Sequence, residues 1–348
     1  MGYMKKYKCP KCLLTSFVIR KTKRKRSILY FCKFCKKYFS INTFWIDRKI
    51  VLIDHLDGLS FRDLSRKHNI STMSAWRICD EELRKLPNNN KFTFNYCNKL
   101  SSTMVVDGKY FNVVNDEDNP DWVLIWGIDY FYPDIPVITI APSESYNSWA
   151  LYFSYFRILN HYPQLLVCDD NINLKTAAYS KFPGVKIQAC FNHFKENIRR
   201  DLKVRSDDYY KPFMKRLELV LDSSNKLSDD TFNNKLFLLY RDFKEDSLAL
   251  KILTNIENNK KELLGYRGIP SSPLTTNLIE GLNGHLEQRL KSICSFQSIN
   301  HAKLWLNGYV LKRRLTKYTD AKGKFRFLNG KCGVDLTKKD RVDIPPLF

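Results

Sequence analysis

The sequence lacks an apolar run long enough to cross a membrane as a helix. Its best candidate, WVLIWGIDYFYPDIPVITIA, is interrupted by Asp129, Asp134 and two prolines. The opening residues, MGYMKKYKCP, have no apolar segment typical of a secretory signal, and Lys6 does not fit a myristoylation site. These absences argue against membrane-spanning and lipid-anchored proteins, and we expect a soluble, intracellular protein.

Acidic residues are scarce at the N-terminal end. The first 50 residues contain 15 Lys or Arg and a single acid, Asp47, and the whole chain carries a formal charge of +22. A bias of this size predicts a polyanionic partner, and its concentration near the N-terminus is typical of a nucleic-acid-binding segment. A chain of 348 residues with 44% apolar residues can build two or three packed domains.

Ten cysteines in an intracellular chain are expected to be reduced thiols or metal ligands, not disulfides. The motif CPKC is followed after 19 residues by CKFC, with short β-like runs between and around them. This spacing predicts a zinc ribbon over residues 1–45; a redox pair or coincidental cysteines are the alternatives. The predicted structural Zn²⁺ ligands are Cys9, Cys12, Cys32 and Cys35.

The run KTKRKR, residues 21–26, is predicted to form the loop between the two cysteine pairs. Its cations can contact DNA phosphates, although a solvated loop would have the same composition. The candidate phosphate-binding residues are Lys21, Lys23, Arg24, Lys25 and Arg26.

Residues 46–95 are predicted to form a small helical DNA-binding domain. Three helices are expected between residues 48 and 86, with Ser60 and Ser71 as N-caps and a break at Asn69. The pattern is that of a helix-turn-helix whose last helix enters the major groove; a plain helical bundle is the alternative. The candidate DNA-contacting residues are Ser71, Thr72, Ser74 and Arg77, and LPNNNKF is predicted to be a linker.

The next segment, residues 100–193, alternates strands and helices. Three successive strands, then a helix, a strand, a helix and a strand predict a mixed sheet flanked by helices, the order found in ribonuclease H-like folds. Residues 194–270 are expected to form an all-α insertion, residues 271–318 the last part of the α/β core, and residues 319–348 a basic tail. The basic run LKRRLTKYTDAKGKFRF, residues 311–327, is expected to follow the DNA backbone, with a solvated terminus as the alternative.

Carboxylates stand at strand positions in the predicted sheet. Asp107 lies inside an apolar strand, where a charge needs a cation or a partner such as a lysine. Asp169 and Asp170 end the run QLLVCDD, at the sheet edge where ligand sites gather in α/β folds. Asp169 follows the apolar run directly, whereas Asp170 can cap the next helix, so we assign the site to Asp169 and keep Asp170 as the alternative.

The segment SPLTTNLIEGLNGHLEQRLK, residues 272–291, predicts an amphipathic helix with Glu280 on its polar side. A solvated surface is the ordinary interpretation of such a face. The alternative is that Glu280 joins Asp107 and Asp169 in holding two Mg²⁺ or Mn²⁺ ions about 4 Å apart, an arrangement suited to phosphodiester chemistry. Glu287, two turns on, is the substitute acid.

Together these motifs resemble the DDE transposases of the Mutator-like group. The resemblance rests on VVDGKYF, LLVCDDNINL, CFNHFKENI and TTNLIEGLNGHLEQRLK, in this order and separated by distances similar to those of the family, and it covers roughly residues 100–315. It implies Asp107, Asp169 and Glu280 as catalytic residues and a helical insertion after CxxH. A glycine often follows the second aspartate in the family, where this chain has Asp170.

The resemblance also marks residues near the catalytic pocket: Cys190, His193, Asn277 and Asp170. A packed cysteine beside a hydrogen-bonded histidine is the alternative for the CxxH pair. No further ligand pair follows at zinc spacing, so a second zinc site is not predicted, and no oxyanion loop supports a Cys/His hydrolase. Trp122, Trp126, Trp149 and Trp305 are expected in the core.

We therefore expect a metal-dependent DNA transposase that binds terminal inverted repeats and target DNA as a dimer or larger assembly. A non-catalytic DNA-binding regulator derived from a transposase and a ribonuclease H-like nuclease without strand transfer are the alternatives.

Overall fold

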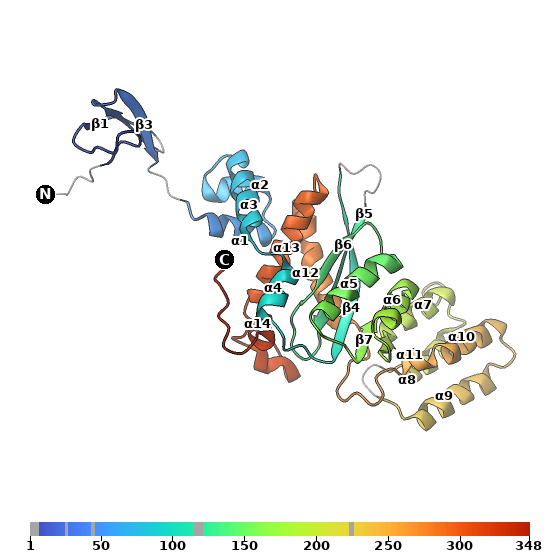
Figure 1. Ribbon diagram of the computed structural model, residues 1–348. Helices are drawn as coiled ribbons and strands as arrows, with labels where there is room; N and C mark the ends of the chain where they lie inside the picture. The colour runs from blue at the N-terminus through green and yellow to red at the C-terminus, as the bar shows by residue number, and fades with distance from the viewer. Residues whose placement is uncertain (1–6, 25–26, 43–45, 115–120, 223–225) are drawn as a thin grey trace. The chain divides into compact units, whose positions relative to one another are not determined.

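The computed structural model describes residues 7–24, 27–42, 46–114, 121–222 and 226–348. The chain divides into two compact units, Met1–Val51 and Leu52–Phe348. Among the described residues, no helix is both long enough and apolar enough to span a membrane. Each unit contains a sheet of its own (Figure 1).

The first unit contains a three-stranded antiparallel sheet with the order β1-β2-β3. Its strands are β1 (Val18–Lys23), β2 (Ser27–Cys32) and β3 (Lys37–Asn42). Part of the basic run is strand where a loop was predicted, because the pairing of β1 with β2 continues to Lys23, opposite Ile28. Lys25 and Arg26 lie outside the described residues.

The three helices predicted between residues 48 and 86 are present as α1 (Arg48–Leu56), α2 (Phe61–His68) and α3 (Thr72–Lys85). The Ser60 and Ser71 side chains cap α2 and α3 as predicted, each accepting a hydrogen bond from a first-turn N–H. Asn69 ends α2 in the left-handed region with φ of 50°. The serines and the asparagine therefore set the helix boundaries.

The prediction that LPNNNKF is a linker is wrong. Asn88 caps a fourth helix, α4 (Asn89–Tyr96), by accepting hydrogen bonds from two first-turn N–H groups. The asparagine run supplies a helix cap instead of a turn, and Phe92 anchors the short helix in the interior.

The second unit is built around a mixed five-stranded sheet with the order β6-β5-β4-β7-β8. Strand β4 pairs antiparallel with β5 and parallel with β7. The strands are β4 (Thr103–Asn112), β5 (Asp121–Asp129), β6 (Ile138–Ala141), β7 (Leu165–Cys168) and β8 (Lys186–Ala189). The α/β class with a mixed sheet is confirmed.

Alternating side chains of the strands point to opposite faces of this sheet, and each face has its own apolar cluster. Val105 and Val167 belong to a cluster with Leu282 and Trp305. Met104 and Leu166 of the same strands belong to another, which includes α5 and α6 side chains. The covering helices are α5 (Tyr146–Ile158) and α6 (Ile172–Lys181) on one face, and α12 (Asn277–Ile293) and α13 (Ile299–Leu315) on the other (Figure 1).

The tryptophans fill these clusters, as predicted. Trp126, Trp149 and Trp305 are fully buried, whereas Trp122 at the start of β5 is half-buried. Gly308 of α13 permits close helix packing, because a Cβ at this position would lie 2.7 Å from the Leu83 side chain of α3.

The five helices α7 to α11 form a helical block beside the sheet (Figure 1). It has its own apolar cluster, including Phe213, Phe232 and Leu253. The buried Gln188 side chain of β8 joins the block to the sheet, because its amide donates to the Leu263 carbonyl and accepts from the Tyr266 N–H. The helices are α7 (Phe191–Asp201), α8 (Lys211–Val220), α9 (Asp229–Asp242), α10 (Ser247–Asn258) and α11 (Lys260–Leu263).

The segment 319–348, predicted as a basic tail, is in part folded onto the core. It contains the 3-10 helix η1 (Gly323–Leu328) and the short helix α14 (Gly333–Thr337), and Val334 is buried in a cluster with Phe92. Immediately before it, the Arg314 side chain is buried and paired with Asp134. A solvated terminus does not describe these residues.

Candidate active site and metal centres

Asp107 and Asp169 lie near each other, since the charge of Asp169 acts on the Asp107 carboxyl. Val105 of β4 and Val167 of β7 form the last pair between these parallel strands, and each aspartate follows two residues later in its own segment. Because side chains alternate along β4, Asp107 belongs to the sheet face that carries Val105, which is the face covered by α12. Asp107 lies within β4, and Asp169 follows the last residue of β7.

Helix α12 brings polar side chains to the same face. Its apolar residues Ile279, Leu282 and Leu286 are buried, as the amphipathic pattern predicts. Asn283, one turn after Glu280, donates from Nδ2 to Asp107 Oδ2 at 2.7 Å. Its own Oδ1 accepts from Trp126 Nε1 at 3.0 Å, which fixes the orientation of the amide. Asn283 therefore ties α12 to β4 and, through Trp126, to β5.

Glu280 is held at the start of α12 by two neighbours. Its Oε1 accepts a hydrogen bond from Thr276 Oγ1 at 2.5 Å and lies 3.6 Å from His193 Nε2. The Glu280 and His193 side chains are each 40% exposed, so the carboxylate is accessible from solvent. The charges of Glu280 and Asp107 both contribute to raising the pKa of His193, after the larger effect of Cys190.

Negative charge is concentrated around the two aspartates. Burial raises the pKa of Asp107 to about 6, and the charge of Asp169 contributes in the same direction. Burial likewise raises the pKa of Asp169. Carboxyl groups in this situation resist ionisation unless a cation neutralises them, so the donor set fits a bound divalent ion.

Sequence reasoning missed a further carboxylate, Glu144. Burial, then Asp169 and Asp107, raise its pKa to about 7. Its Oε2 accepts from Asn171 Nδ2 at 2.8 Å. Gly108 makes room for it, since a Cβ at that position would lie 2.4 Å from Glu144 Oε1. The available signal was an acid shortly after β6, in the sequence APSES before the cap of α5.

The structure separates the roles of the two neighbouring aspartates. Asp170 pairs with Lys175, which is also paired with Glu262. Asp170 is not the helix cap that was considered for it, because the Asn171 side chain caps α6. Asp169 lies near Asp107. Asp170 belongs to a group of ion pairs that links α6 to the helical block.

Asp107, Asp169 and Glu280 do not together form one of the described ligand groups whose atoms all lie within 4.8 Å of one another, although Glu280 belongs to such a group with Cys190 and His193. The 4.8 Å limit applies to the ligands of a single ion. The ligands of two ions about 4 Å apart can lie farther from one another, so three carboxylates can bind such a pair without meeting that limit. Carboxylate oxygens are ligands suited to Mg²⁺ or Mn²⁺. Glu287, the substitute acid, forms ion pairs with Lys109 and Lys291, and its pKa is lowered to about 2.

Three of the predicted near-site residues, Cys190, His193 and Asn277, lie at the start of α7 and α12, whereas Asp170 is paired with Lys175. Cys190 is buried, and its sulfur lies against His193 and raises the pKa of that histidine to about 9. Asn277 Oδ1 accepts from Asn192 Nδ2 at 2.9 Å. The CxxH turn therefore contacts the helix that carries Glu280.

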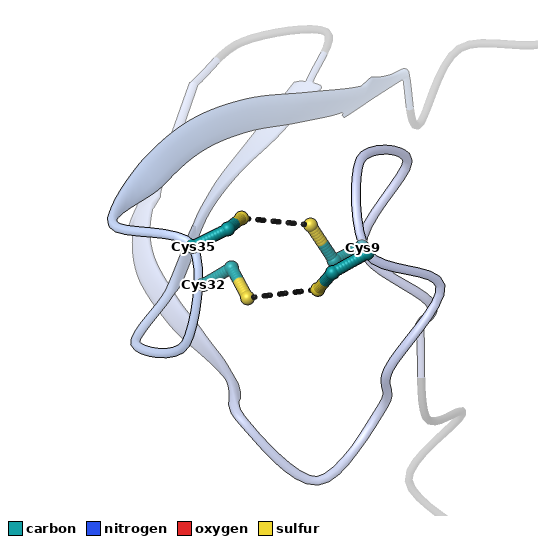
Figure 2. Close-up of side chains that lie close together, drawn as sticks. Cys9, Cys32 and Cys35 are labelled. Atoms are coloured by element: carbon teal, nitrogen blue, oxygen red, sulfur yellow. Dashed lines mark hydrogen bonds between the residues drawn. The ribbon is translucent and has the colours of Figure 1, made fainter.

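The first unit holds a four-cysteine group. The Sγ atoms of Cys9 and Cys35 are 3.5 Å apart and those of Cys12 and Cys32 3.6 Å apart, and all four sulfurs lie within 4.8 Å of one another. Figure 2 shows the labelled Cys9, Cys32 and Cys35 side chains converging from the two knuckles. Four thiols in this arrangement fit a tetrahedral zinc ion, which a zinc ribbon requires.

The predicted DNA-binding side chains are exposed where the structure describes them. Lys21, Lys23 and Arg24 lie on and just beyond β1. On α3 the inward positions Ala75, Ile78 and Cys79 are buried, and the outward face carries the predicted residues. Its exposed members are Ser71, Thr72, Ser74 and Arg77.

A basic groove runs along α12 away from Glu280. One cavity, of about 290 Å³, is lined by Asn277, Gly281 and His285, and the next, of about 300 Å³, by Arg289 and Lys317. The two cavities share His285, Arg313 and Tyr318. Burial and the positive charges of Arg289 and Arg313 lower the pKa of His285. Asp57 and Asp320 also line the second cavity, but its cations Arg289, Lys312, Arg313 and Lys317 outnumber them, so the groove suits a phosphate group.

Comparison with known proteins identifies the family. The model of the family described as "Transposase, Mutator family" matches residues 100–312, which include both sheet aspartates, the CxxH turn, the helical block and α12. The search of curated proteins found no significant match. The chain belongs to the Mutator family of transposases.

Proposed function

We propose that the chain is an active DDE transposase whose α/β core is ribonuclease H-like and in which Asp107, Asp169 and Glu280 hold two Mg²⁺ or Mn²⁺ ions. The observation that carries the proposal is the nearness of Asp107 to Asp169, whose charge acts on it, together with the hydrogen bond from Asn283 of α12 to Asp107. When bound, the two ions supply an activated water and stabilise the departing oxygen during phosphodiester cleavage.

The surrounding side chains hold the carboxylates in position. Asn283 donates to Asp107, and Trp126 fixes Asn283, so the Asp107 carboxylate is oriented before DNA arrives. Thr276 does the same for Glu280. Glu144 has a pKa of about 7, which suits it to take up or release a proton beside the reacting phosphate.

The exposed basic residues bind the DNA. The Cys9–Cys35 ribbon, with a structural zinc, and the outward face of α3 recognise the terminal inverted repeats, the ribbon through phosphates and α3 through base edges. The basic groove along α12 follows the phosphate backbone next to the active site. Two element ends must be joined, so the protein acts as a dimer or larger assembly.

The test is metal-dependent cleavage of DNA that contains the element's ends. With Mg²⁺ or Mn²⁺ the protein nicks at the end and then joins the freed 3′-hydroxyl to target DNA. Asp107→Asn abolishes nicking and retains DNA binding. Glu287→Gln is the matched control, since this carboxylate lies on the same helix but is neutralised by Lys109 and Lys291; it leaves nicking unchanged.

The alternatives give other products in the same assay. Binding without cleavage under every divalent ion identifies a DNA-binding regulator that keeps the core as a scaffold. Cleavage without joined products identifies a nuclease. Either result overturns the proposed transposition chemistry.

A further inference from the structure

A second cluster of metal-ligand side chains lies beside the proposed catalytic residues. One ligand atom each from Cys190, His193 and Glu280 come within 4.8 Å of one another. Cys190 precedes α7, His193 lies in its first turn, and Glu280 lies in the first turn of α12. The start of α7 thus contributes a sulfur and a nitrogen, and the start of α12 an oxygen, to one group of potential metal ligands.

The polar atoms of this cluster are only partly satisfied by the protein. Cys190 Sγ accepts hydrogen bonds from the Thr276 N–H at 3.3 Å and from Thr276 Oγ1 at 3.1 Å, an environment that favours a thiolate. His193 Nδ1 is buried, and apart from the neighbouring Cys190 sulfur it has no hydrogen-bond partner among the described residues. A metal ion bound by the sulfur and the ring would satisfy both groups.

We propose that Cys190, His193 and Glu280 bind a Zn²⁺ ion, separate from the ribbon zinc, and that this ion competes with the catalytic divalent ion for Glu280. A thiolate, an imidazole and a carboxylate are the ligands that zinc takes, and three of them leave its fourth position open. The site differs from the Asp107 and Asp169 pair, which offers oxygen alone and suits hard cations. Sequence spacing missed the site because the third ligand comes from 87 residues after His193.

The competition rests on the proposed function, whereas zinc binding does not. A zinc ion that occupies Glu280 removes one of the three carboxylates from the catalytic pair of ions. Free zinc therefore slows DNA cleavage at concentrations that fill this site, and Mg²⁺ or Mn²⁺ in excess reverses the effect.

The experiment is a calorimetric zinc titration of the full chain already loaded with one equivalent in the ribbon. Wild type takes up a second equivalent. Cys190→Ser abolishes it, and Glu280→Gln weakens it at least about tenfold, as expected for loss of a ligand. Cys294→Ser is the matched control, because Cys294 is an exposed cysteine at the end of α12 outside both described ligand groups; it retains the second equivalent. Cobalt in place of zinc reports thiolate ligation by its absorption.

The outcomes separate the two claims. Uptake of a single equivalent by wild type, or a second equivalent that persists in both Cys190→Ser and Glu280→Gln, overturns the zinc site. A second equivalent lost in Cys190→Ser but unchanged in Glu280→Gln overturns the competition. A protein that binds the second zinc yet never cleaves DNA with Mg²⁺ or Mn²⁺ refutes the proposed function and leaves the zinc site standing.

Discussion

In residues 7–42 the buried described side chains are Cys9, Tyr30 and Cys32, whereas the five-stranded sheet carries an extensive apolar cluster on each face. The first segment is too small to build a hydrophobic core, and two of its three buried residues are potential metal ligands. The second buries whole aromatic side chains such as Trp126 and Trp305. The stability of the ribbon should therefore depend on a metal, and that of the larger unit on apolar packing.

The two units also differ in whether their charged side chains are exposed to solvent or removed from it. Lys21, Lys23 and Arg24 are exposed on the ribbon, where they add to a positive surface. The larger unit buries the ion pair of Arg314 with Asp134 and holds Asp107 and Asp169 partly buried, close enough for their charges to interact. Exposed cations suit the long-range attraction of a polyanion, whereas charges removed from water need a defined partner.

The largest expected effect comes from metal removal. Chelation, or Cys9→Ser, should unfold the ribbon, because zinc supplies on the order of 10 kcal/mol to the folding of such small domains. Limited proteolysis should then cut within residues 7–42 while residues 52–348 keep their thermal transition. If chelation also removed the thermal transition of residues 52–348, the larger unit would depend on a metal as well, which contradicts the difference between the two units.

The next effect concerns the proposed catalytic residues of the larger unit. Asp169→Asn should lower the cleavage rate at least about 1,000-fold, which corresponds to about 4 kcal/mol in the barrier. Asp170→Asn is the control, because Asp170 is paired with Lys175; its cleavage rate should stay within about threefold of wild type. Equal losses in the two variants would contradict the assignment of Asp169, and the cobalt spectrum of the ribbon should be unchanged in both.

A third prediction concerns the buried ion pair. Arg314 Nε and Nη2 each lie 2.7 Å from an oxygen of Asp134, and both side chains are fully buried. Asp134→Ala should lower the free energy of unfolding of the larger unit by about 3 to 5 kcal/mol, since it leaves a buried guanidinium unpaired. Asp340→Ala breaks the exposed pair with Lys99 and should cost less than about 1 kcal/mol. Urea unfolding followed by tryptophan fluorescence gives both values.

The smallest effect is a pH dependence of the larger unit. Burial lowers the pKa of His55 to about 4 from its ordinary value of about 6.5, so the folded state holds the imidazole neutral. The neutral imidazole does not reduce the free energy of unfolding above pH 6.5. As the pH falls from 6.5 toward 4, the unfolded chain takes up a proton that the folded state does not, and the free energy of unfolding falls by about 2 to 3 kcal/mol. His161, whose pKa is also lowered to about 4 by burial, acts in the same direction.

The variant His55→Gln tests whether the pH dependence of the free energy of unfolding comes from His55. Its free energy of unfolding, measured from urea curves between pH 7 and pH 4.5, should fall less steeply than that of wild type and should keep the part due to His161. An unchanged slope would assign the pH dependence to other groups.

Much of the fold followed from local patterns. Apolar runs such as MVV and LLVC predicted the strands that carry Asp107 and Asp169, and Ser60 and Ser71 predicted the helix starts. These features depend on neighbouring residues, which the sequence displays directly. Helix α4 was missed because its apolar pattern is weak. The helix is stabilised by the burial of Phe92 in the core, which the local sequence does not reveal.

Long-range contacts account for the rest. Asn283 contacts Asp107 across 176 positions, and Arg314 contacts Asp134 across 180. Glu144 joins the aspartates because Gly108 leaves space for it. No spacing rule relates such residues, because the folded sheet and its covering helices bring them together.

The central claim is that Asp107, Asp169 and Glu280 share divalent ions, and Mn²⁺ binding to the zinc-loaded, DNA-bound protein tests it most directly. Electron paramagnetic resonance should show two magnetically coupled Mn²⁺ ions in wild type, and the coupling should vanish in both Asp107→Asn and Glu280→Gln. A Mn²⁺ signal that is the same in wild type and in these two variants would contradict the account.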